Sequence, residues 1–529
     1  MLSLLLAAAA FHIDPAILSS DIKVLASDEF EGRGPGTPGE QKTVDYLIKR
    51  FKDAGAEPAG ENGGWTQSVE MQRTTIGPDR AIGFAGNGNQ CAIDATAETV
   101  LWTRNPGARV DLQNIPVVFA GYGISAPDRG WDDFAGADLT GKLVIVFTND
   151  PDWSRDDGPF GGRRMTNYAR LGTKGEEAGR RGAAAVLAVH DDASTEYDWA
   201  TAKNFMAGPA NGLASSDAGK VRFGGYLSNG VSRKILACAG LNLDSERKAA
   251  EQPGYRAKLL AGVTFSAAFD VDVKKTVTRN VVAKFRGSKY PDEYFVYTAH
   301  WDHLGRGKPD TTGDDIYNGA LDNAGGTAGL LSLARAFGRG KKTDRSILFI
   351  AMTLEESGLL GSEYYASHPT VPLAKMVGGF NMDAINLFGP TGTMEVTAMG
   401  QSTLEDHLER ELKAQGRVMK DDPNSVVGFY YRSDHFPFAK RGVPFIFAGS
   451  GWDIAEGVMA KHVRASETGG RFHRPSDEWL PDLDFAAAAR DVELYYLVGS
   501  KLANSREWPV WKSGTEFAAE RAKSDSERK

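Results

Sequence analysis

The stretch YFVYTAHWDHLG, residues 294–305, decides the fold. Its first six residues are apolar or β-forming and predict a buried strand. After it, short apolar strands alternate with longer amphipathic stretches. The later strands are RSILFIAMT (345–353), KMVGGFNM (375–382) and VPFIFAG (443–449), and the helices include GGTAGLLSLARAFG (325–338), LEDHLERELKAQG (404–416) and DFAAAARDVELYYLVGSKLA (484–503). This alternation predicts an α/β fold with a largely parallel central sheet.

The chain before this stretch has a different pattern of predicted helices, strands and loops. Residues 12–58 read as helices, because VDYLIKRFKDAG has apolar residues at helical spacing and ends at a glycine. Residues 65–120 read as strands. Within residues 115–260, GKLVIVFTND reads as a strand, and a short helix and a second strand follow it. A polar loop rich in Gly and Asp, at about 152–166, separates the first strand from the helix.

Acids and histidines follow the predicted strands of the second half, where ligands bind in open α/β sheets. They come from segments that chain order places along one edge of the sheet. The set is His300 and Asp302 in TAHWDHLG, Asp322 in NGALDNAGG, Glu355 and Glu356 in TLEESG, Asp383 after MVGGFNM, and His473 in RFHRPSDEW. We therefore expect these side chains to converge.

Two imidazoles and three carboxylates form a donor set that suits zinc. A carboxylate shared between two ions would let them lie about 3.5–4 Å apart, as in two-metal hydrolases. One further carboxylate must stay off the metals to accept a proton from the attacking water. Glu355 and Glu356 can divide the roles of ligand and base, because both can face the site from a loop just past a strand end.

Each residue taken alone has a simpler explanation. Asp322 before a helix fits a helix cap, and Glu355 with Glu356 fits a solvated helix start. His300 alone fits a hydrogen-bonded surface histidine. Five such groups at successive strand ends are much harder to explain in these ways.

Charge and composition argue against a nucleic-acid-binding protein and a membrane-spanning protein. The 529 residues contain 61 Lys and Arg against 69 Asp and Glu, for a net charge of −8, whereas nucleic-acid binders are usually basic. No stretch reaches the roughly 18 apolar residues of a membrane span. MLSLLLAAAAF (1–11) resembles the apolar core of a signal peptide without its basic start, and a frayed, non-native start is the alternative. Cys91 and Cys238 either pair in an oxidising compartment or stay apart as core residues.

The motifs resemble those of the M28 zinc exopeptidases, a family that includes bacterial leucyl aminopeptidases and glutamate carboxypeptidases. The resemblance covers most of the chain. It is carried by ASDEFEGRGPGTPGEQKTVDYL (26–47), NVVAKFRG (280–287), AHWDHLG (299–305), NGALDNAGGTAGLL (318–331), TLEESGLLGSEYYA (353–366), FNMDAIN (380–386), YRSDHFPF (431–438) and FHRPSDEW (472–479). It implies a three-layer zinc-exopeptidase fold with a central mixed, mostly parallel sheet.

The resemblance also implies a role for each site residue. His300 and Asp383 would bind one zinc ion, Glu356 and His473 the other, and Asp322 would bridge the two. Glu355 would be the general base and Asp302 an acid that orients His300. The peptide bond after Asp322 would be cis.

The resemblance also gives expectations for the tyrosine and histidine residues. Tyr430 would stabilise the oxyanion, with packing as the alternative for Tyr430 and its neighbour Tyr431. His303, His435 and His462 match no ligand position, and we expect packing or hydrogen-bonding roles for them.

Residues 96–265 resemble an inserted β-rich PA (protease-associated) domain, on AGYGISAPDRGWDDFAGADLTGKLVIVF (120–147) and GTKGEEAGRRGAAAVLAVH (172–190). Such domains are non-catalytic and are thought to shape the substrate cleft. The expected organisation is a signal-peptide remnant at 1–10, the peptidase domain at 11–95 and 266–510, the insertion at 96–265 and a loose polar tail at 511–529.

The expected activity is that of a di-zinc aminopeptidase that releases N-terminal residues from peptides. The first alternative is a carboxypeptidase or dipeptidase, with Arg432 binding the substrate carboxylate. The others are a binding protein without metals and a single-zinc glutaminyl cyclase, and manganese or cobalt could replace zinc. Peptide is the expected partner, with no nucleic acid, no membrane span and a monomer as the default. The expected location is periplasmic or extracellular, with the cytoplasm as the alternative.

Overall fold

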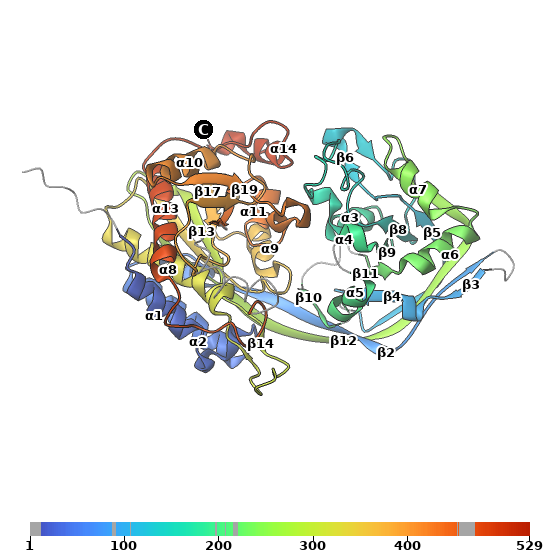
Figure 1. Ribbon diagram of the computed structural model, residues 1–529, viewed down its shortest axis with the longest axis horizontal. Helices are drawn as coiled ribbons and strands as arrows, with labels where there is room; N and C mark the ends of the chain where they lie inside the picture. The colour runs from blue at the N-terminus through green and yellow to red at the C-terminus, as the bar shows by residue number, and fades with distance from the viewer. Residues whose placement is uncertain are drawn as a thin grey trace, which may run out of the picture. The chain divides into compact units, whose positions relative to one another are not determined.

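The computed structural model describes residues 12–86, 91–105, 107–195, 198–206, 208–214, 221–451, 453 and 471–528. The predicted signal-peptide remnant and His462 therefore lie outside the described residues. The chain forms two compact units (Figure 1). Unit 1 comprises residues 1–69, 277–423 and 429–529, and unit 2 comprises 70–276 and 424–428. The predicted insertion limits, 96 and 265, both lie within unit 2.

Unit 1 is built on a mixed, mostly parallel sheet with the strand order β19-β18-β20-β17-β13-β16-β12. Four of its neighbouring pairs are parallel, β13 with β16 and β17, β17 with β20, and β18 with β19, while β12–β16 and β18–β20 are antiparallel. The strands are β12 (Lys258–Phe285), β13 (Tyr290–His300), β16 (Arg345–Met352), β17 (Met376–Asn381), β18 (Thr393–Val396), β19 (Val418–Asp421) and β20 (Phe445–Ser450), and β1 (Glu57–Pro58) pairs with β12. The predicted α/β fold class is confirmed.

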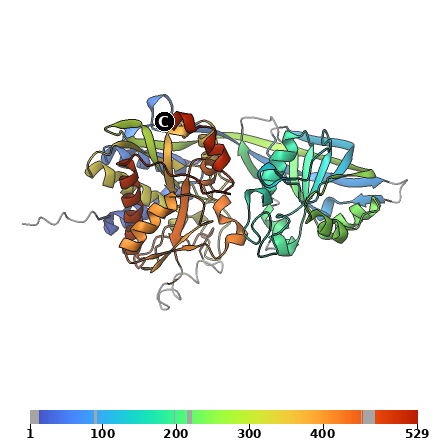
Figure 2. The same ribbon diagram turned by 90° about the horizontal axis from the view of Figure 1, so that it is seen from above.

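Helices cover both faces of this sheet (Figures 1 and 2). Successive residues of a strand point to opposite faces, so Ile347 and Phe349 of β16 join one core while Leu348 and Ile350 join another. The first core is closed by α1 (Pro15–Leu25), α2 (Pro38–Asp53), α8 (Gly325–Arg339), α10 (Leu404–Ala414) and α13 (Phe485–Ala503). The second core is closed by α9 (Leu360–Ser367) and α11 (Phe436–Lys440). The unit is thus the expected three-layer structure.

The predicted tail, residues 511–529, is folded onto unit 1 over its described part, up to residue 528. It contains α14 (Ala518–Ala522), in which Arg521 is buried and donates to the backbone oxygen of Met376 at 2.7 Å. Phe517, just before this helix, is buried against Trp511. The expectation of a loose tail was wrong, because two apolar rings and one arginine anchor a segment that is otherwise polar.

In unit 2 the strand order continues from β12 as β5-β8-β9-β11-β4, in which β5, β8, β9 and β11 are parallel neighbours. Apolar residues pack on both faces, as with Ile145 on one side and Val144 on the other. Its strands are β4 (Thr99–Trp102), β5 (Arg109–Phe119), β8 (Leu143–Phe147), β9 (Ala185–Val189) and β11 (Phe223–Leu227), with β2 (Thr66–Gly86), β3 (Cys91–Asp94) and β10 (Ala210–Leu213) beside them, and its helices include α3 (Leu171–Arg180), α4 (Asp192–Thr195), α5 (Trp199–Met206), α6 (Asn229–Cys238) and α7 (Leu243–Ala250).

A disulfide joins Cys91, at the start of β3, to Cys238, at the end of α6, with Cα atoms 5.8 Å apart. The bond closes a loop of 147 residues. Such bonds stabilise a fold mainly by restricting the unfolded chain. Among the two alternatives for these cysteines, the structure shows the paired one.

We expect the double substitution Cys91→Ser with Cys238→Ser to lower the free energy of unfolding of unit 2 by about 2–4 kcal/mol. Thermal unfolding with and without a reductant measures this effect. The reductant should lower the melting temperature of the wild type and leave the double variant unchanged. Equal melting temperatures for the reduced and oxidised wild type would contradict a stabilising bond.

No helix in the described ranges is both long and apolar enough to cross a membrane.

Candidate functional site

The carboxyl ends of three neighbouring strands of unit 1 bring the predicted site residues together. His300 is the last residue of β13. Glu355 and Glu356 follow the end of β16 at Met352, and Asp383 follows the end of β17 at Asn381. Because these strands are parallel neighbours, the residues that follow them emerge at one edge of the sheet.

Two further residues reach this edge from other segments. Asp322 lies in a helical turn, η6 (Ala320–Ala324), directly before α8. The peptide bond from Asp322 to Asn323 is cis, as the family resemblance implies. His473 lies in the segment that precedes α13 and has a positive φ of 55°.

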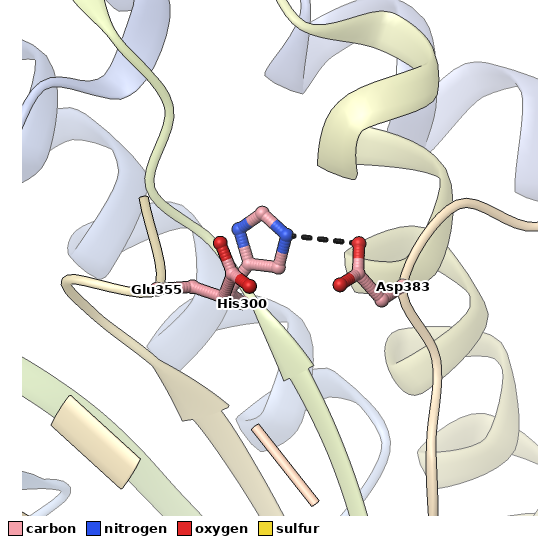
Figure 3. A group of neighbouring side chains, drawn as sticks. All are labelled: His300, Glu355 and Asp383. Carbon is pink, nitrogen blue, oxygen red and sulfur yellow. Dashed lines mark hydrogen bonds and ion pairs between the residues drawn. The ribbon is translucent and has the colours of Figure 1, made fainter. Parts of the chain in front are cut away.

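Glu355, His300 and Asp383 form the first group (Figure 3). One potential ligand atom of each lies within 4.8 Å of the others. The Nε2 atom of His300 is 3.1 Å from Oδ1 of Asp383. All three side chains point toward one another from three different strand ends, so they can surround one small ligand.

Asp322 lies between the two predicted histidines. Its Oδ1 atom is 3.3 Å from Nε2 of His300, and its Oδ2 atom is 3.1 Å from Nε2 of His473. The same nitrogen of His473 is 3.0 Å from Oε2 of Glu356. The two oxygens of one carboxylate thus face two separate sets of partners, which is the arrangement expected of a bridging ligand.

His303 also belongs to this group, although we expected only a packing or hydrogen-bonding role for it. Its Nδ1 atom is 2.6 Å from Oε1 of Glu356, and it lies close enough to Asp322 and Glu356 to be a ligand with them. The contact with Glu356 agrees with a hydrogen-bonding role. The signal that could have found it is its place in the sequence, three residues beyond His300 in the same strand-end loop.

Asp302 is fully buried beside His300, but its carboxylate does not hold the imidazole directly. The distance from its Oδ1 atom to Nδ1 of His300 is 3.7 Å, whereas the backbone oxygen of Asp302 is 3.1 Å from that nitrogen. Its carboxylate instead accepts the backbone N–H of Glu355 at 3.2 Å. The main chain of Asp302 therefore orients His300, while the side chain of Asp302 binds the main chain of Glu355.

Burial and crowding of carboxylates shape the protonation of the site. Burial raises the pKa of Glu355 well above its usual value, and the carboxylates of Asp383 and Asp434 raise it further. Burial alone would lower the pKa of His300, but the carboxylates of Asp383 and Glu355 outweigh it and raise that pKa well above the ordinary value. The crowded carboxylates therefore favour positive charge at this buried site, and a bound cation can supply such charge.

The donor set fits a divalent cation with nitrogen and oxygen ligands. Two ligand atoms on one tetrahedral ion with bonds of 2.0–2.2 Å lie about 3.3–3.6 Å apart. The contacts of His300 and His473 with the facing carboxylates span 3.0–3.3 Å. A small outward adjustment of these side chains would therefore accommodate an ion among them.

Among the described residues, the ring contacts of Tyr430 involve neither the predicted metal ligands nor Glu355. Its ring packs against Tyr431, His435 and Phe517, and burial raises the pKa of its hydroxyl well above the usual value. Tyr431 donates to Oε2 of Glu516 at 3.0 Å. The packing alternative for both tyrosines agrees with these contacts, and a catalytic role for Tyr430 stays a prediction.

His435 is buried between Tyr430 and Phe447, in line with the packing role expected for it. Arg432 is exposed, and its guanidinium lies 5.9 Å from the ring of Phe429.

Comparison with known proteins adds a family match. Residues 280–497 match the model of Peptidase family M28. This segment includes all five predicted ligand positions and Glu355.

Several curated proteins are similar to parts of the chain. A probable zinc metalloprotease of Pyrenophora tritici-repentis is 37% identical over 257 residues, which are 44% of this chain and 58% of that protein. Aminopeptidase YwaD of Bacillus subtilis is 29% identical over 167 residues, or 31% of this chain and 33% of that protein. The chain thus matches less than two thirds of the length of either relative.

A solved structure extends the similarity in fold. The aminopeptidase from Aneurinibacillus sp. strain AM-1 is similar over 92% of this chain and 93% of its own, with a TM-score of 0.50 and 19% sequence identity. Because the sequence identity is this low, the similarity supports a common fold and nothing more.

Proposed function

Residues 280–497 make the chain a member of peptidase family M28, and from this premise we propose that it is a zinc-dependent exopeptidase that removes N-terminal residues from peptides. One observation carries the proposal. Asp322 faces His300 with one oxygen and His473 with the other, at 3.3 and 3.1 Å. A carboxylate in that position is what a pair of neighbouring ions requires, because their mutual repulsion must be offset between them.

The proposed ligands divide into two sets around Asp322. His300 and Asp383 would hold one zinc ion, and Glu356 and His473 would hold the other. His303, 2.6 Å from Glu356, would then orient that ligand through a hydrogen bond. The ligand types also accommodate manganese or cobalt.

Bound zinc would polarise the scissile carbonyl and acidify a water molecule. Glu355 would take the proton of the attacking water at a carboxylate oxygen and then deliver it to the departing amine nitrogen. Burial raises the pKa of Glu355 above that of an ordinary carboxyl group, which is the direction that favours proton transfer by a carboxylate base. The N–H of Glu355, donated to Asp302 at 3.2 Å, would fix the main chain from which this side chain extends.

We propose that unit 2 is a non-catalytic, PA-like domain of this peptidase. The two segments on which the resemblance is based, residues 120–147 and 172–190, contain β8 and β9, two neighbouring strands of its parallel core. We also propose a periplasmic or extracellular location. The disulfide between Cys91 and Cys238 supports it, because such bonds persist in oxidising compartments.

The substrate polarity can be tested with one peptide in three forms. We expect rapid hydrolysis of the free peptide and of its C-terminal amide, and a loss of about 10–150-fold in kcat/KM on N-terminal acetylation. That range corresponds to the loss of a hydrogen bond to a charged amine, about 1.5–3 kcal/mol. Product analysis by mass spectrometry and metal content by elemental analysis complete the measurement.

Each alternative gives a different result in this assay. Cleavage of the acetylated peptide, with resistance of the amide, would indicate a carboxypeptidase and would turn attention to Arg432. One zinc per chain instead of two would favour a glutaminyl cyclase type of site. The absence of bound zinc together with the absence of hydrolysis would favour a binding protein.

A further inference from the structure

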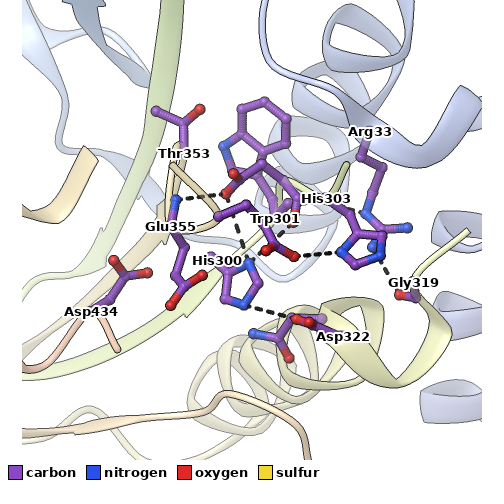
Figure 4. A network of polar contacts seen from close by, with 12 residues as sticks. Arg33, His300, Trp301, His303, Gly319, Asp322, Thr353, Glu355 and Asp434 are labelled. Atoms are coloured by element: carbon purple, nitrogen blue, oxygen red, sulfur yellow. Dashed lines mark hydrogen bonds and ion pairs between the residues drawn. The ribbon is translucent and has the colours of Figure 1, made fainter. Parts of the chain in front are cut away.

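Arg33 is a buried arginine that lies next to the proposed metal site and is assigned no role above. It ends a short helical turn, η1 (Asp28–Arg33), within the segment ASDEFEGRGPGTPGE. Its side chain is fully buried and reaches the segments that carry His300 and Asp322 (Figure 4). Burial lowers its pKa to about 10, so the guanidinium still carries a positive charge at neutral pH.

All four hydrogen bonds of this guanidinium go to backbone oxygens. Nε donates to Trp301 at 2.8 Å, directly after the proposed ligand His300. Nη1 donates to Asn318 at 2.5 Å and Nη2 to Gly319 at 2.8 Å, shortly before the proposed ligand Asp322. A second bond from Nη1 reaches Leu25 at 2.8 Å. One rigid planar group thus ties together the two main-chain segments from which these ligands extend.

Asp477 holds the same segment from its other end. Its carboxylate accepts the backbone N–H groups of Leu321 and Asp322, each at 3.1 Å, and its backbone oxygen accepts that of Ala320 at 2.9 Å. The carbonyls at 318 and 319 therefore face a cation, and the amides at 321 and 322 face an anion. Both charged side chains are almost completely buried.

The backbone between these two charges has little freedom to shift. Gly319 has a φ of +56°, and a Cβ atom there would lie 2.1 Å from the backbone oxygen of Asp322 and 2.6 Å from the ring of His303. A close approach of this kind requires glycine. The segment from Asn318 to Asp322 is thus fixed by its main chain, and its position depends on the groups that bind that main chain.

We propose that Arg33 is a positioning residue which, with Asp477, holds the segment of Asp322 at the right distance from His300 and thereby sets the affinity for the metal ions. The inference rests on the proposed function, since it concerns the same site. The positioning matters because the carboxylates of the site repel one another before an ion binds. When the ligands are already held in place, less of the binding free energy is lost in ordering them, and the ion binds more tightly.

The test compares two lysine substitutions in the full-length protein. Arg33→Lys keeps the charge but loses the fork that reaches four carbonyls. Arg345→Lys is the matched control, because Arg345 is equally buried in unit 1 and donates to the backbone oxygens of Leu502 and Glu507 at 3.0 and 2.8 Å. It begins β16, at the strand end opposite to the site.

The readouts are the zinc dissociation constant of the metal-free protein, by competition with a chelator, and the visible absorption spectrum of the cobalt-loaded protein. We expect Arg33→Lys to weaken zinc binding by about 10–100-fold, the range for partners that orient metal ligands, and to change the cobalt spectrum. Arg345→Lys should lower the melting temperature without either effect. Asp477→Asn, which acts on the other end of the same segment, is expected to behave like Arg33→Lys and serves if that variant does not fold.

The outcomes separate this inference from the proposed function. Equal zinc affinities for the wild type, Arg33→Lys and Asp477→Asn, at whatever melting temperature, would overturn the positioning role. Zinc binding that depends on Arg33, in a protein that cleaves no peptide, would support the positioning role and refute the peptidase activity. A wild type that binds no zinc would overturn both.

Discussion

Replacing Glu355 with glutamine is expected to lower kcat by about 10²–10⁴-fold, the contribution that general acid–base catalysis makes in other enzymes. The substitution keeps the size of the side chain and its main-chain hydrogen bond to Asp302. It removes the carboxylate oxygen that would accept the proton of the attacking water. The zinc content should stay at the wild-type value, because the proposed ligands are all retained, and KM should change little.

The measurement is a steady-state assay on a free-amine peptide, with elemental analysis of the same sample. Glu363→Gln is a suitable control, because Glu363 lies in the same stretch of sequence, on α9, and forms an ion pair with Arg441 instead of facing the site. It should retain nearly full activity. A Glu355→Gln variant with near-normal turnover would show that the base has been assigned to the wrong residue.

The second large effect is expected for Asp322→Asn. An amide in place of the carboxylate offers one oxygen where two now face His300 and His473 at 3.3 and 3.1 Å. It also removes the negative charge that would lie between two cations. We expect zinc affinity to fall by more than the roughly 10–100-fold that the loss of an outer partner costs, with activity falling in parallel.

Zinc titration of the metal-free variant, followed by activity at each zinc concentration, checks this expectation. Asp491→Asn provides a comparison, since Asp491 is buried in unit 1 and accepts a hydrogen bond from Arg417 at 2.6 Å, away from the site. It should lose stability but keep its zinc affinity. If Asp322→Asn bound two zinc ions as tightly as the wild type, Asp322 would not bridge them.

The positions of most site residues could be predicted because an apolar run followed by an acid or a histidine marks the end of a buried strand in the sequence. His300 and Asp383 lie at or just after the ends of apolar runs that predict buried strands, and the carboxyl ends of parallel strands meet at one edge of the sheet. The five predicted ligands do lie together. Their roles as ligands remain proposals, which the two substitutions above address.

Other features have no such trace. Arg33 acts on backbone oxygens, which every residue has, so no spacing of side chains could indicate its partners. Tyr430 packs on Phe517, which lies 87 residues later in a segment that reads as polar. The unit boundaries near 70 and 276 fall within the continuous strands β2 and β12, where no loop composition marks a border.

The distance in sequence between Arg33 and Asp477 has a consequence for biosynthesis. His473 and Asp477 are synthesised more than four hundred residues after Arg33. A nascent chain that has reached Asp383 already contains four of the five proposed ligands, but it lacks the fifth, His473, and the carboxylate of Asp477 that binds the segment of Asp322. For the metal site proposed above, full affinity would therefore require that translation has passed Asp477.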